Sequence, residues 1–241
     1  MSGMSGVLTG VGVGPGDPEL MTLRGARTLR EADIVFAPKA PGSGESLALA
    51  IARPHMRSGA EVAVLEYGMS TAAEERAAIW RKHAATVVAA LAEGKNAVYI
   101  TIGDPLLYST FTYLVREIEA APPAAKIRTV PGIDSVSAAA ALAGVPLGEG
   151  ERPVTILPGC DDQDLLARAL DLGGVVAVMK IGKTLPGVAA LLDGRGLLER
   201  AVIAARVGLD GERIVRGLSA LDAHEPGVGN MSILLIDPEP I

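Results

Sequence analysis

The chain has 241 residues, of which 49% are apolar and 21% charged. This composition excludes a mainly disordered chain and allows one large domain or two of roughly 120 residues each. The formal net charge of −6 argues against a nucleic-acid backbone as the main partner, and the single cysteine excludes an intrachain disulfide.

Along the first 143 residues, short apolar runs alternate with helix-like stretches, a pattern typical of α/β proteins. We expect strands at Val7–Val13, Asp33–Ala37, Glu61–Leu65, Ala97–Ile102 and Ile127–Val130. We expect helices at Thr22–Glu31, Glu45–Arg53, Ala72–Glu93, Leu107–Ala120 and Ser135–Ala143. At the start of the longest helix, Thr71 and Glu74 form a capping-box pattern, and Gly94 stands at its end.

The second half repeats this alternation. The expected strands are Val154–Leu157, Val175–Met179, Val202–Ala205, Ile214–Gly217 and Ser232–Ile236. Helices are expected at Asp162–Leu170, Leu185–Asp193 and Leu197–Arg200. The turn-rich stretch Pro146–Pro153 is predicted to join two α/β domains, residues 1–148 and 149–241, and the pair Pro122–Pro123 is an alternative boundary.

Other features of the sequence bear on where the protein is located and which partners it has. The first residues lack the charged and long apolar regions of a secretory signal, and no apolar run reaches the roughly 18 residues that span a bilayer. Cys160 and the three histidines are scattered, so no metal site is expected. Cys160 has no evident base beside it and is predicted to be unreactive. We expect a cytoplasmic protein with neither membrane nor nucleic-acid partner.

A glycine-rich motif follows the first predicted strand, Gly10-Val-Gly-Val-Gly-Pro-Gly-Asp17-Pro18. Its glycines allow a tight turn and close approach of the backbone to a ligand. It does not match the dinucleotide fingerprint, because the third glycine is out of place and two prolines delay the helix. A plain turn without ligand, with Asp17 capping the next helix, is the alternative interpretation.

Two further motifs also follow strands. Asp104 begins the segment Asp-Pro-Leu-Leu-Tyr-Ser-Thr after one strand, and Asp134 follows Pro-Gly-Ile after another. Each aspartate could simply cap a helix, as could Ser135. Because the carboxyl ends of parallel strands bind ligands in open α/β sheets, we expect the three motifs to converge at one edge of the first sheet.

In this order the motifs resemble those of the tetrapyrrole methylases, the class III S-adenosylmethionine-dependent methyltransferases. The similarity covers essentially the whole chain, and the continuation from Glu19 to Val35 is also typical of that family. Within the family, the segments Gly103–Phe111 and Pro131–Ala138 are most similar to methylases that act on carbon 20 of precorrin-2 in vitamin B12 synthesis.

The resemblance implies two α/β domains with the active-site cleft between them, usually in a homodimer, and S-adenosylmethionine as the cofactor with S-adenosylhomocysteine as its product. Carried over position by position, the implied cofactor contacts in the first domain are Val13, Asp104, Leu107, Ser109, Thr110, Gly132 and Ile133. Those in the second domain are Met179, Ala205 and Ser232.

The reaction that the resemblance implies is methyl transfer to carbon with loss of a proton from carbon 20, and no metal is needed. Asp17 and Tyr108 are candidate catalytic bases because of their places in the motifs. The substrate carries eight carboxylates, so an acidic protein must gather cations locally, and the candidates are Arg24, Arg27 and Lys39. The alternative for each cation is a solvated helix charge.

Three other functions stay open at this point. The first is a sibling reaction, either on another corrin carbon or on the cobalt-bearing substrate. The second is an RNA or protein methylase of the same class, such as a ribosomal RNA or diphthine methylase, against which the net charge of −6 and the Tyr-Ser-Thr-Phe segment argue. The third is a non-catalytic nucleotide-binding module, which should prefer ATP or NAD to S-adenosylhomocysteine.

Overall fold

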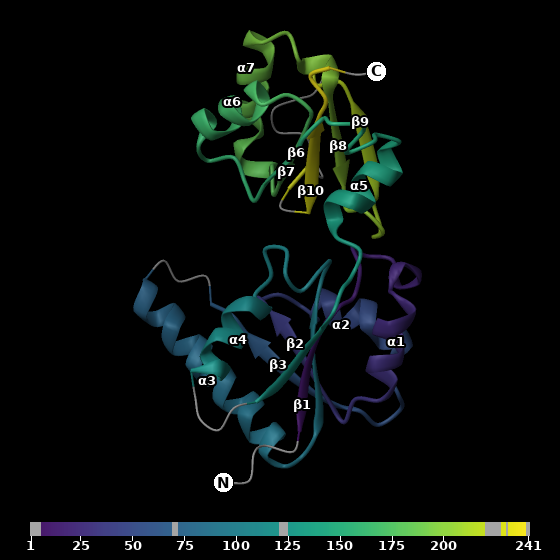
Figure 1. Cartoon of the computed structure of the whole chain (residues 1–241), viewed down its shortest axis with the longest axis vertical. Helices are drawn as coiled ribbons and strands as arrows, with labels where there is room; N and C mark the ends of the chain where they lie inside the picture. Colours follow the sequence, from purple (N-terminus) through teal and green to yellow (C-terminus); the bar gives the residue numbers. More distant parts are fainter. Residues whose placement is uncertain (1–5, 69–71, 121–124, 220–227, 230, 240–241) are drawn as a thin grey trace. The chain divides into compact units, whose positions relative to one another are not determined.

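The structure is a computed structural model that describes residues 6–68, 72–120, 125–219, 228–229 and 231–239 (Figure 1). The chain divides into two compact units, Met1–Asp134 and Ser135–Ile241, each with one five-stranded sheet. In these described ranges no helix is both long enough and apolar enough to cross a membrane.

The first unit is built on a wholly parallel sheet, with strands in the order β3-β2-β4-β1-β5. The strands are β1 (Val7–Gly12), β2 (Ile34–Lys39), β3 (Glu61–Glu66), β4 (Asn96–Thr101) and β5 (Lys126–Val130). Parallel neighbours need crossover connections, which contain α1 (Leu23–Arg30), α2 (Leu47–Ala52), α3 (Ala73–Ala92) and α4 (Phe111–Glu119). Two short 3-10 helices are η1 (Pro18–Leu20) and η2 (Arg53–His55).

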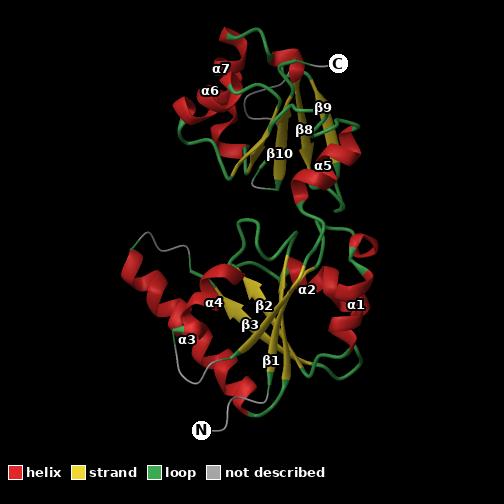
Figure 2. Cartoon of the chain, viewed as in Figure 1, coloured by secondary structure: helices red, strands yellow, loops and turns green. Residues whose placement is uncertain are grey.

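Both faces of the first sheet are covered by helices, as Figure 2 shows. Side chains alternate between the two faces of a strand, so the apolar runs supply two cores. Val11 and Ile100 belong to the core under α1 and α2. Phe36 and Tyr99 belong to the core under α3 and α4, and both are fully buried. The strands are thereby held rigidly, with their carboxyl ends along one edge.

The second unit has a mixed sheet in the order β6-β7-β10-β8-β9, in which, among the described strands, β6 and β7 are the one pair of neighbours that is parallel. Its strands are β6 (Val154–Leu157), β7 (Val175–Met179), β8 (Ala201–Ala205), β9 (Arg213–Arg216) and β10 (Ser232–Ile236). Its helices are α5 (Ser135–Ala143), α6 (Gln163–Asp171), α7 (Leu185–Gly194), η3 (Gly182–Thr184) and η4 (Leu198–Arg200).

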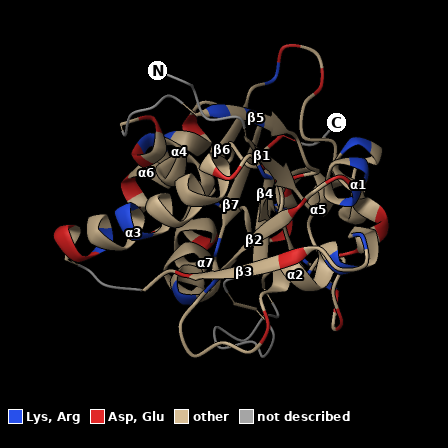
Figure 3. Cartoon of the chain, turned by 90° about the horizontal axis from the view of Figure 1, so that it is seen from below, with Lys and Arg blue, Asp and Glu red and all other residues tan. Residues whose placement is uncertain are grey.

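Helices again cover two faces of this sheet. Leu166 of α6 and Val188 of α7 share a buried core with Leu234 of β10. On the other face, Val136 of α5 packs in a cluster with Ala204 of β8. Figure 3 shows the charged residues of both signs distributed over helices and loops, while most strand residues are uncharged.

The two-domain α/β fold that the sequence predicts is confirmed, and three details differ. First, α5 belongs to the second unit because its small apolar side chains pack on β8 and β10, so the division falls after Asp134 and not after residue 148. Second, α4 begins at Phe111 and not at Leu107, because Tyr108 has a left-handed φ of 50°. Third, Ala72 and not Thr71 is the N-cap of α3, and Thr71 lies outside the described residues.

Candidate functional site

Three loops meet at the carboxyl edge of the first sheet, after β1, β4 and β5. They meet because β1 pairs with both β4 and β5. The Gly103 amide donates to the Gly14 carbonyl at 2.8 Å, and the Val13 amide donates to the Thr101 carbonyl at 2.9 Å. The convergence of the three motifs that the sequence predicts is therefore confirmed.

Glycine is required where these loops touch. A Cβ added to Gly12 would lie 2.3 Å from the Gly103 carbonyl oxygen, and one added to Gly132 would lie 2.2 Å from the same atom. Gly12 and Gly132 also approach each other closely, since the Gly132 Cβ would lie 2.7 Å from the Gly12 Cα. The three backbones are thus in direct contact, which leaves no room for a side chain at Gly12 or Gly132.

Asp104 ties two of the loops together. Its Oδ1 accepts from the Leu106 amide at 2.8 Å, and its Oδ2 accepts from the Gly132 amide at 3.1 Å. Asp104 therefore does not cap a helix, because the next helix, α4, begins only at Phe111. Each carboxylate oxygen keeps a second lone pair with which it can accept from a ligand.

The segment after Asp104 is held against β4 by two hydroxyls. The Ser109 side chain is buried, donates to Thr101 Oγ1 at 3.1 Å and accepts from the Phe111 amide at 3.1 Å. Thr110 Oγ1 lies 2.7 Å from the hydroxyl of Tyr99. Burial raises the pKa of Tyr99 to about 12, so its phenol stays protonated at neutral pH.

The other predicted residues of the first unit differ in accessibility. Val13 is fully buried in the core beneath α1 and α2. Leu107 is half-buried, whereas Ile133 is 37% exposed and Tyr108 is 49% exposed. Ile133 and Tyr108 are consequently the apolar and aromatic groups of this set that a ligand could contact most readily.

The predicted cofactor residues of the second unit also lie at one end of their sheet. Ser232 at the start of β10 is paired with Ala205 at the end of β8. Met179 ends β7 beside them, and the amide of the next residue, Lys180, donates to the Ser232 carbonyl at 3.1 Å. The Ser232 hydroxyl accepts from the Gly229 amide at 3.1 Å.

Backbone strain marks three of these places. Among the described residues, the non-glycine residues with positive φ are Tyr108 (50°), Lys180 (57°) and Arg206 (53°). Tyr108 lies between Leu107 and Ser109, Lys180 follows Met179, and Arg206 follows Ala205. Left-handed non-glycine residues are costly and concentrate at functional sites, so their positions next to predicted contacts favour ligand-binding loops in both units.

The candidate base Asp17 has a structural task. Its Oδ1 accepts from the Glu19 amide at 2.8 Å and so caps η1, the alternative that the sequence left open. The residue is only half-buried.

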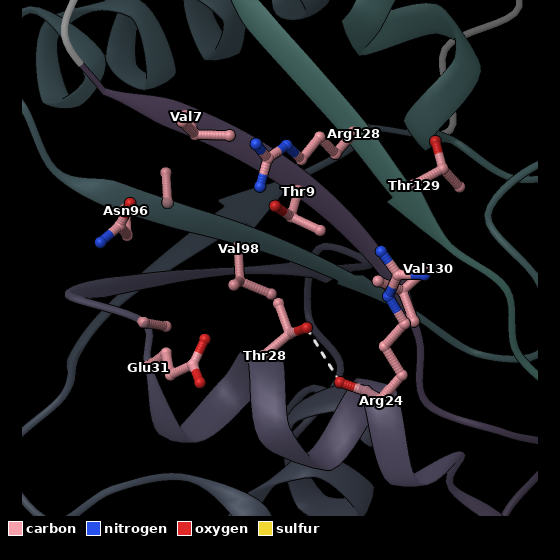
Figure 4. A pocket seen from close by; sticks show the side chains of 12 residues that line it. Val7, Thr9, Arg24, Thr28, Glu31, Asn96, Val98, Arg128, Thr129 and Val130 are labelled. Atoms are coloured by element: carbon pink, nitrogen blue, oxygen red, sulfur yellow. Dashed lines mark hydrogen bonds between the residues drawn. The ribbon is translucent and has the colours of Figure 1, made fainter.

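The three candidate cations lie on two elements, Arg24 and Arg27 on α1 and Lys39 at the end of β2. Arg24 lines a cavity of about 160 Å³ on the face of the first sheet, where Figure 4 shows it with Thr9, Thr28 and Arg128. Arg27 is exposed on α1, and Lys39 at the end of β2 lies 3.5 Å from Glu66 Oε1. The cavity beside Arg24 is also lined by Val130, the last residue of β5 before the third loop.

One pair of residues, Tyr67 and Tyr99, was not found from the sequence. Their hydroxyls lie 3.2 Å apart, although Tyr67 follows β3 and only Tyr99 lies within a buried strand, where a tyrosine signals a polar contact. Cys160 is buried, and desolvation raises the pKa of its thiol, which agrees with an unreactive side chain. Among the described residues, no group of three or more His, Cys, Asp or Glu side chains could hold a metal.

Comparison with known families places residues 7–221 in the family of Tetrapyrrole (Corrin/Porphyrin) Methylases. The chain is 34% identical to the cobalt-precorrin-2 C(20)-methyltransferase of Salmonella typhimurium, over 92% of this chain and 93% of the relative. It is 32% identical to the precorrin-2 C(20)-methyltransferase of a Sinorhizobium species, over 86% of each chain. The chain spans about half, 46%, of the cobalamin biosynthesis protein CobIJ of Mycobacterium tuberculosis, to which it is 34% identical.

Solved structures share the fold. The cobalt precorrin-4 methyltransferase CbiF superposes with a TM-score of 0.72 at 23% identity, covering 96% of this chain and 94% of that chain. The uroporphyrin-III C-methyltransferase of Thermus thermophilus, solved with S-adenosylhomocysteine, superposes with a TM-score of 0.64 at 22% identity. It covers 96% of this chain and 97% of that one.

Proposed function

This chain belongs to the tetrapyrrole methylase family, and from that premise we propose that it is the methyltransferase acting on carbon 20 of precorrin-2 in cobalamin biosynthesis. The similarity to relatives named for this reaction, at 32–34% identity over most of the chain, carries the proposal. The cobalt-bearing form of the same substrate is the second candidate, because the relatives from Salmonella typhimurium and Methanocaldococcus jannaschii are named for it.

The residues present fit S-adenosylmethionine as the cofactor. The contact of Gly12 with Gly132 holds the backbones of three loops together at the carboxyl edge of the parallel sheet, where open α/β sheets bind ligands. In the first unit we propose contacts from Val13, Asp104, Leu107, Ser109, Thr110, Gly132 and Ile133. In the second unit we propose contacts from the small or flexible side chains of Met179, Ala205 and Ser232.

When bound, S-adenosylmethionine supplies a methyl group on a sulfonium centre, and the sulfur keeps the electron pair of the broken bond as the methyl is transferred to carbon. The chain has to orient the reactants and exclude water, because the methyl group is already electrophilic. Asp104 orients the second and third loops through its bonds to Leu106 and Gly132. Buried Ser109 holds the segment behind them in place.

A proton must also leave carbon 20 of the substrate. We propose the Asp17 carboxylate as its acceptor, because it belongs to the glycine-rich motif and is only half-buried, and Tyr108 as the alternative. The variants Asp17→Asn and Tyr108→Phe test the assignment in single-turnover assays. Loss of the methyl-transfer rate in one variant, with unchanged affinity for the cofactor, identifies the base, and unchanged rates in both variants exclude both residues.

Arg24, Arg27 and Lys39 remain proposals for the carboxylates of the substrate. Lys39 is supported best, since it ends β2 at the carboxyl edge of the sheet. Binding through pairs of cations and carboxylates weakens with salt. The KM for the tetrapyrrole should therefore rise with ionic strength and the KM for the cofactor should not. A KM for the tetrapyrrole that is independent of salt excludes this role.

A homodimer in the cytoplasm completes the proposal, supported by the family resemblance. Light scattering during size-exclusion chromatography measures the mass directly against the 24.7 kDa of one chain. A mass near twice this value supports the dimer, and the mass of one chain contradicts it.

The experiment that tests the proposed function is an anaerobic assay with labelled methyl groups. Precorrin-2, with or without cobalt, is supplied together with methyl-labelled S-adenosylmethionine, and the product is examined by mass and carbon NMR. One added methyl group at carbon 20 supports the proposal, and the better of the two substrates separates the two candidates. Methylation at another carbon, or of RNA or protein alone, contradicts it.

A further inference from the structure

A chain of three hydroxyl groups runs from the edge of the first unit to the loop after β4. The Tyr99 hydroxyl donates to the Tyr67 hydroxyl at 3.2 Å. On its other side, the Tyr99 hydroxyl lies 2.7 Å from Thr110 Oγ1. Tyr67 follows β3, Tyr99 lies within β4, and Thr110 precedes α4, so the chain links three elements that are distant in the sequence.

The middle of the chain is a buried tyrosine where a phenylalanine would fill the same space. Tyr99 is fully buried, and its ring packs 5.6 Å from the ring of Phe111. A buried hydroxyl is unfavourable unless it is hydrogen-bonded, and this one has two partners. The ring of Tyr99 fills the core as a phenylalanine ring would, and its hydroxyl adds two hydrogen bonds.

The outer end of the chain is braced by aromatic rings. The ring of Tyr67 lies 4.5 Å from that of Trp80 and 4.7 Å from that of His83, both on α3. His83 Nε2 in turn lies 2.8 Å from the carbonyl oxygen of Glu66, next to Tyr67 in the sequence. Because the ring of Tyr67 is held on two sides, its hydroxyl is a fixed partner for Tyr99.

At its inner end, the chain of hydroxyl groups holds the side chain of Thr110 in place. Thr110 stands at the N-cap position of α4, yet its hydroxyl caps no amide of that helix. Tyr99 has one hydroxyl proton, which it donates to Tyr67, so the proton of the second bond comes from Thr110. The Thr110 oxygen is left with its lone pairs, and it can accept a hydrogen bond from an N–H or O–H group of a ligand.

We propose that Tyr99, supported by Tyr67, is a positioning residue that fixes the Thr110 hydroxyl as a hydrogen-bond acceptor for the cofactor. This inference rests on the proposed function, because it takes Thr110 as a cofactor contact. Tyr99 and Tyr67 touch neither cofactor nor substrate. Their loss should weaken cofactor affinity and raise the KM for S-adenosylmethionine, while kcat at saturating cofactor changes little.

The test is calorimetric titration of the full chain with S-adenosylhomocysteine, which requires no turnover. We expect Tyr99→Phe and Thr110→Val each to weaken binding by about tenfold, and Tyr67→Phe by about twofold to threefold. Thr110→Ser, which keeps the hydroxyl, should restore most of the affinity. The double variant Tyr99→Phe/Thr110→Val should bind S-adenosylhomocysteine no more weakly than Thr110→Val alone, because both changes remove the same contact.

Tyr113→Phe is the matched control. Tyr113 belongs to the same group of rings, lying 5.2 Å from Trp80, and the variant keeps that ring while removing a half-exposed hydroxyl. Its affinity for S-adenosylhomocysteine should equal that of the unchanged chain. Thermal unfolding of every variant identifies those that fail to fold, and Tyr67→Phe tests the inference even if Tyr99→Phe does not fold.

The outcomes separate this inference from the proposed function. If the unchanged chain does not bind S-adenosylhomocysteine, the proposed function fails. If the unchanged chain binds and Tyr99→Phe binds equally well, only the positioning role is overturned. Additive losses in Tyr99→Phe and Thr110→Val also overturn it, since they would show that the two hydroxyls act separately.

Discussion

Gly132 is a residue of the loop cluster at which one added methyl group should displace the backbone. In Gly132→Ala the new Cβ would lie 2.2 Å from the Gly103 oxygen, so a backbone segment must move. We expect the free energy of unfolding to fall by about 1–3 kcal/mol and binding of S-adenosylhomocysteine to be lost. Denaturant unfolding and calorimetry measure the two effects. Gly44→Ala is the control, because nothing lies within 4 Å of its added Cβ.

Tyr99 should make the stability of the protein sensitive to alkaline pH. Burial raises the pKa of Tyr99 from 10.0 to about 12 in the folded chain, so the unfolded chain loses this proton at lower pH than the folded one. The stabilisation is complete below about pH 10 and is lost as the pH rises through about 12, with a total of about 2–3 kcal/mol.

Denaturant unfolding between pH 8 and about pH 12 checks this sign. The unfolding free energy of the unchanged chain should decline over the upper part of that range. In Tyr99→Phe the decline should be smaller, because the phenol that titrates has been removed. An identical pH dependence in the two proteins would contradict the assignment.

At the scale of residues, the sequence predicts the three loops well and the hydroxyl chain poorly. Gly12, Asp104 and Gly132 belong to local motifs, and their convergence follows from the rule that parallel strands end at one edge. The contact of Tyr99 with Thr110 depends on the start of α4, four residues later than predicted. That delay comes from the left-handed Tyr108, which no local pattern reveals.

Among the elements, α6 offers a test of local helix stability. Asp162 is its N-cap, and Oδ1 accepts from the Leu165 amide at 3.1 Å. Asp162→Ala should lower the free energy of unfolding by about 1 kcal/mol, since an amide at the helix start loses its partner. The neighbouring Asp161→Ala, which removes a carboxylate outside the helix, is the control. Equal losses in the two variants would contradict the capping role.

The order of helices and strands along the first unit could be predicted, because each strand is followed by a helix that leads to the next strand. The assignment of α5 could not, because its apolar composition, Ser-Val-Ser-Ala-Ala-Ala-Ala-Leu-Ala, fits either neighbouring sheet equally well. Only the packing of Val136 and Ala139 against β8 and β10 decides it. The antiparallel pairing of β10 could not be predicted either. A fully buried strand is apolar at every position, and this pattern does not indicate in which direction the strand runs.

For the whole molecule, ligand-dependent unfolding separates an enzyme of this family from a general nucleotide-binding module. S-adenosylhomocysteine at about 100 times its Kd should add about 2.7 kcal/mol to the unfolding free energy, raising Tm by roughly 5–10 °C. ATP and NAD at the same concentration should leave Tm unchanged. Stabilisation by ATP or NAD, but not by S-adenosylhomocysteine, would contradict the methyltransferase assignment.

The contact between Gly12 and Gly132 also limits how this protein can diverge. The backbone of each glycine and the Gly103 oxygen exclude a side chain at the other glycine. A substitution at one of the two positions therefore does not make room for a substitution at the other. We expect side-chain substitutions in this cluster to be accepted at neighbouring positions, such as Ile133 and Leu106, both of which reach the surface. In a library of random variants, we expect folded proteins to keep glycine at positions 12 and 132 and to accept many residue types at positions 106 and 133.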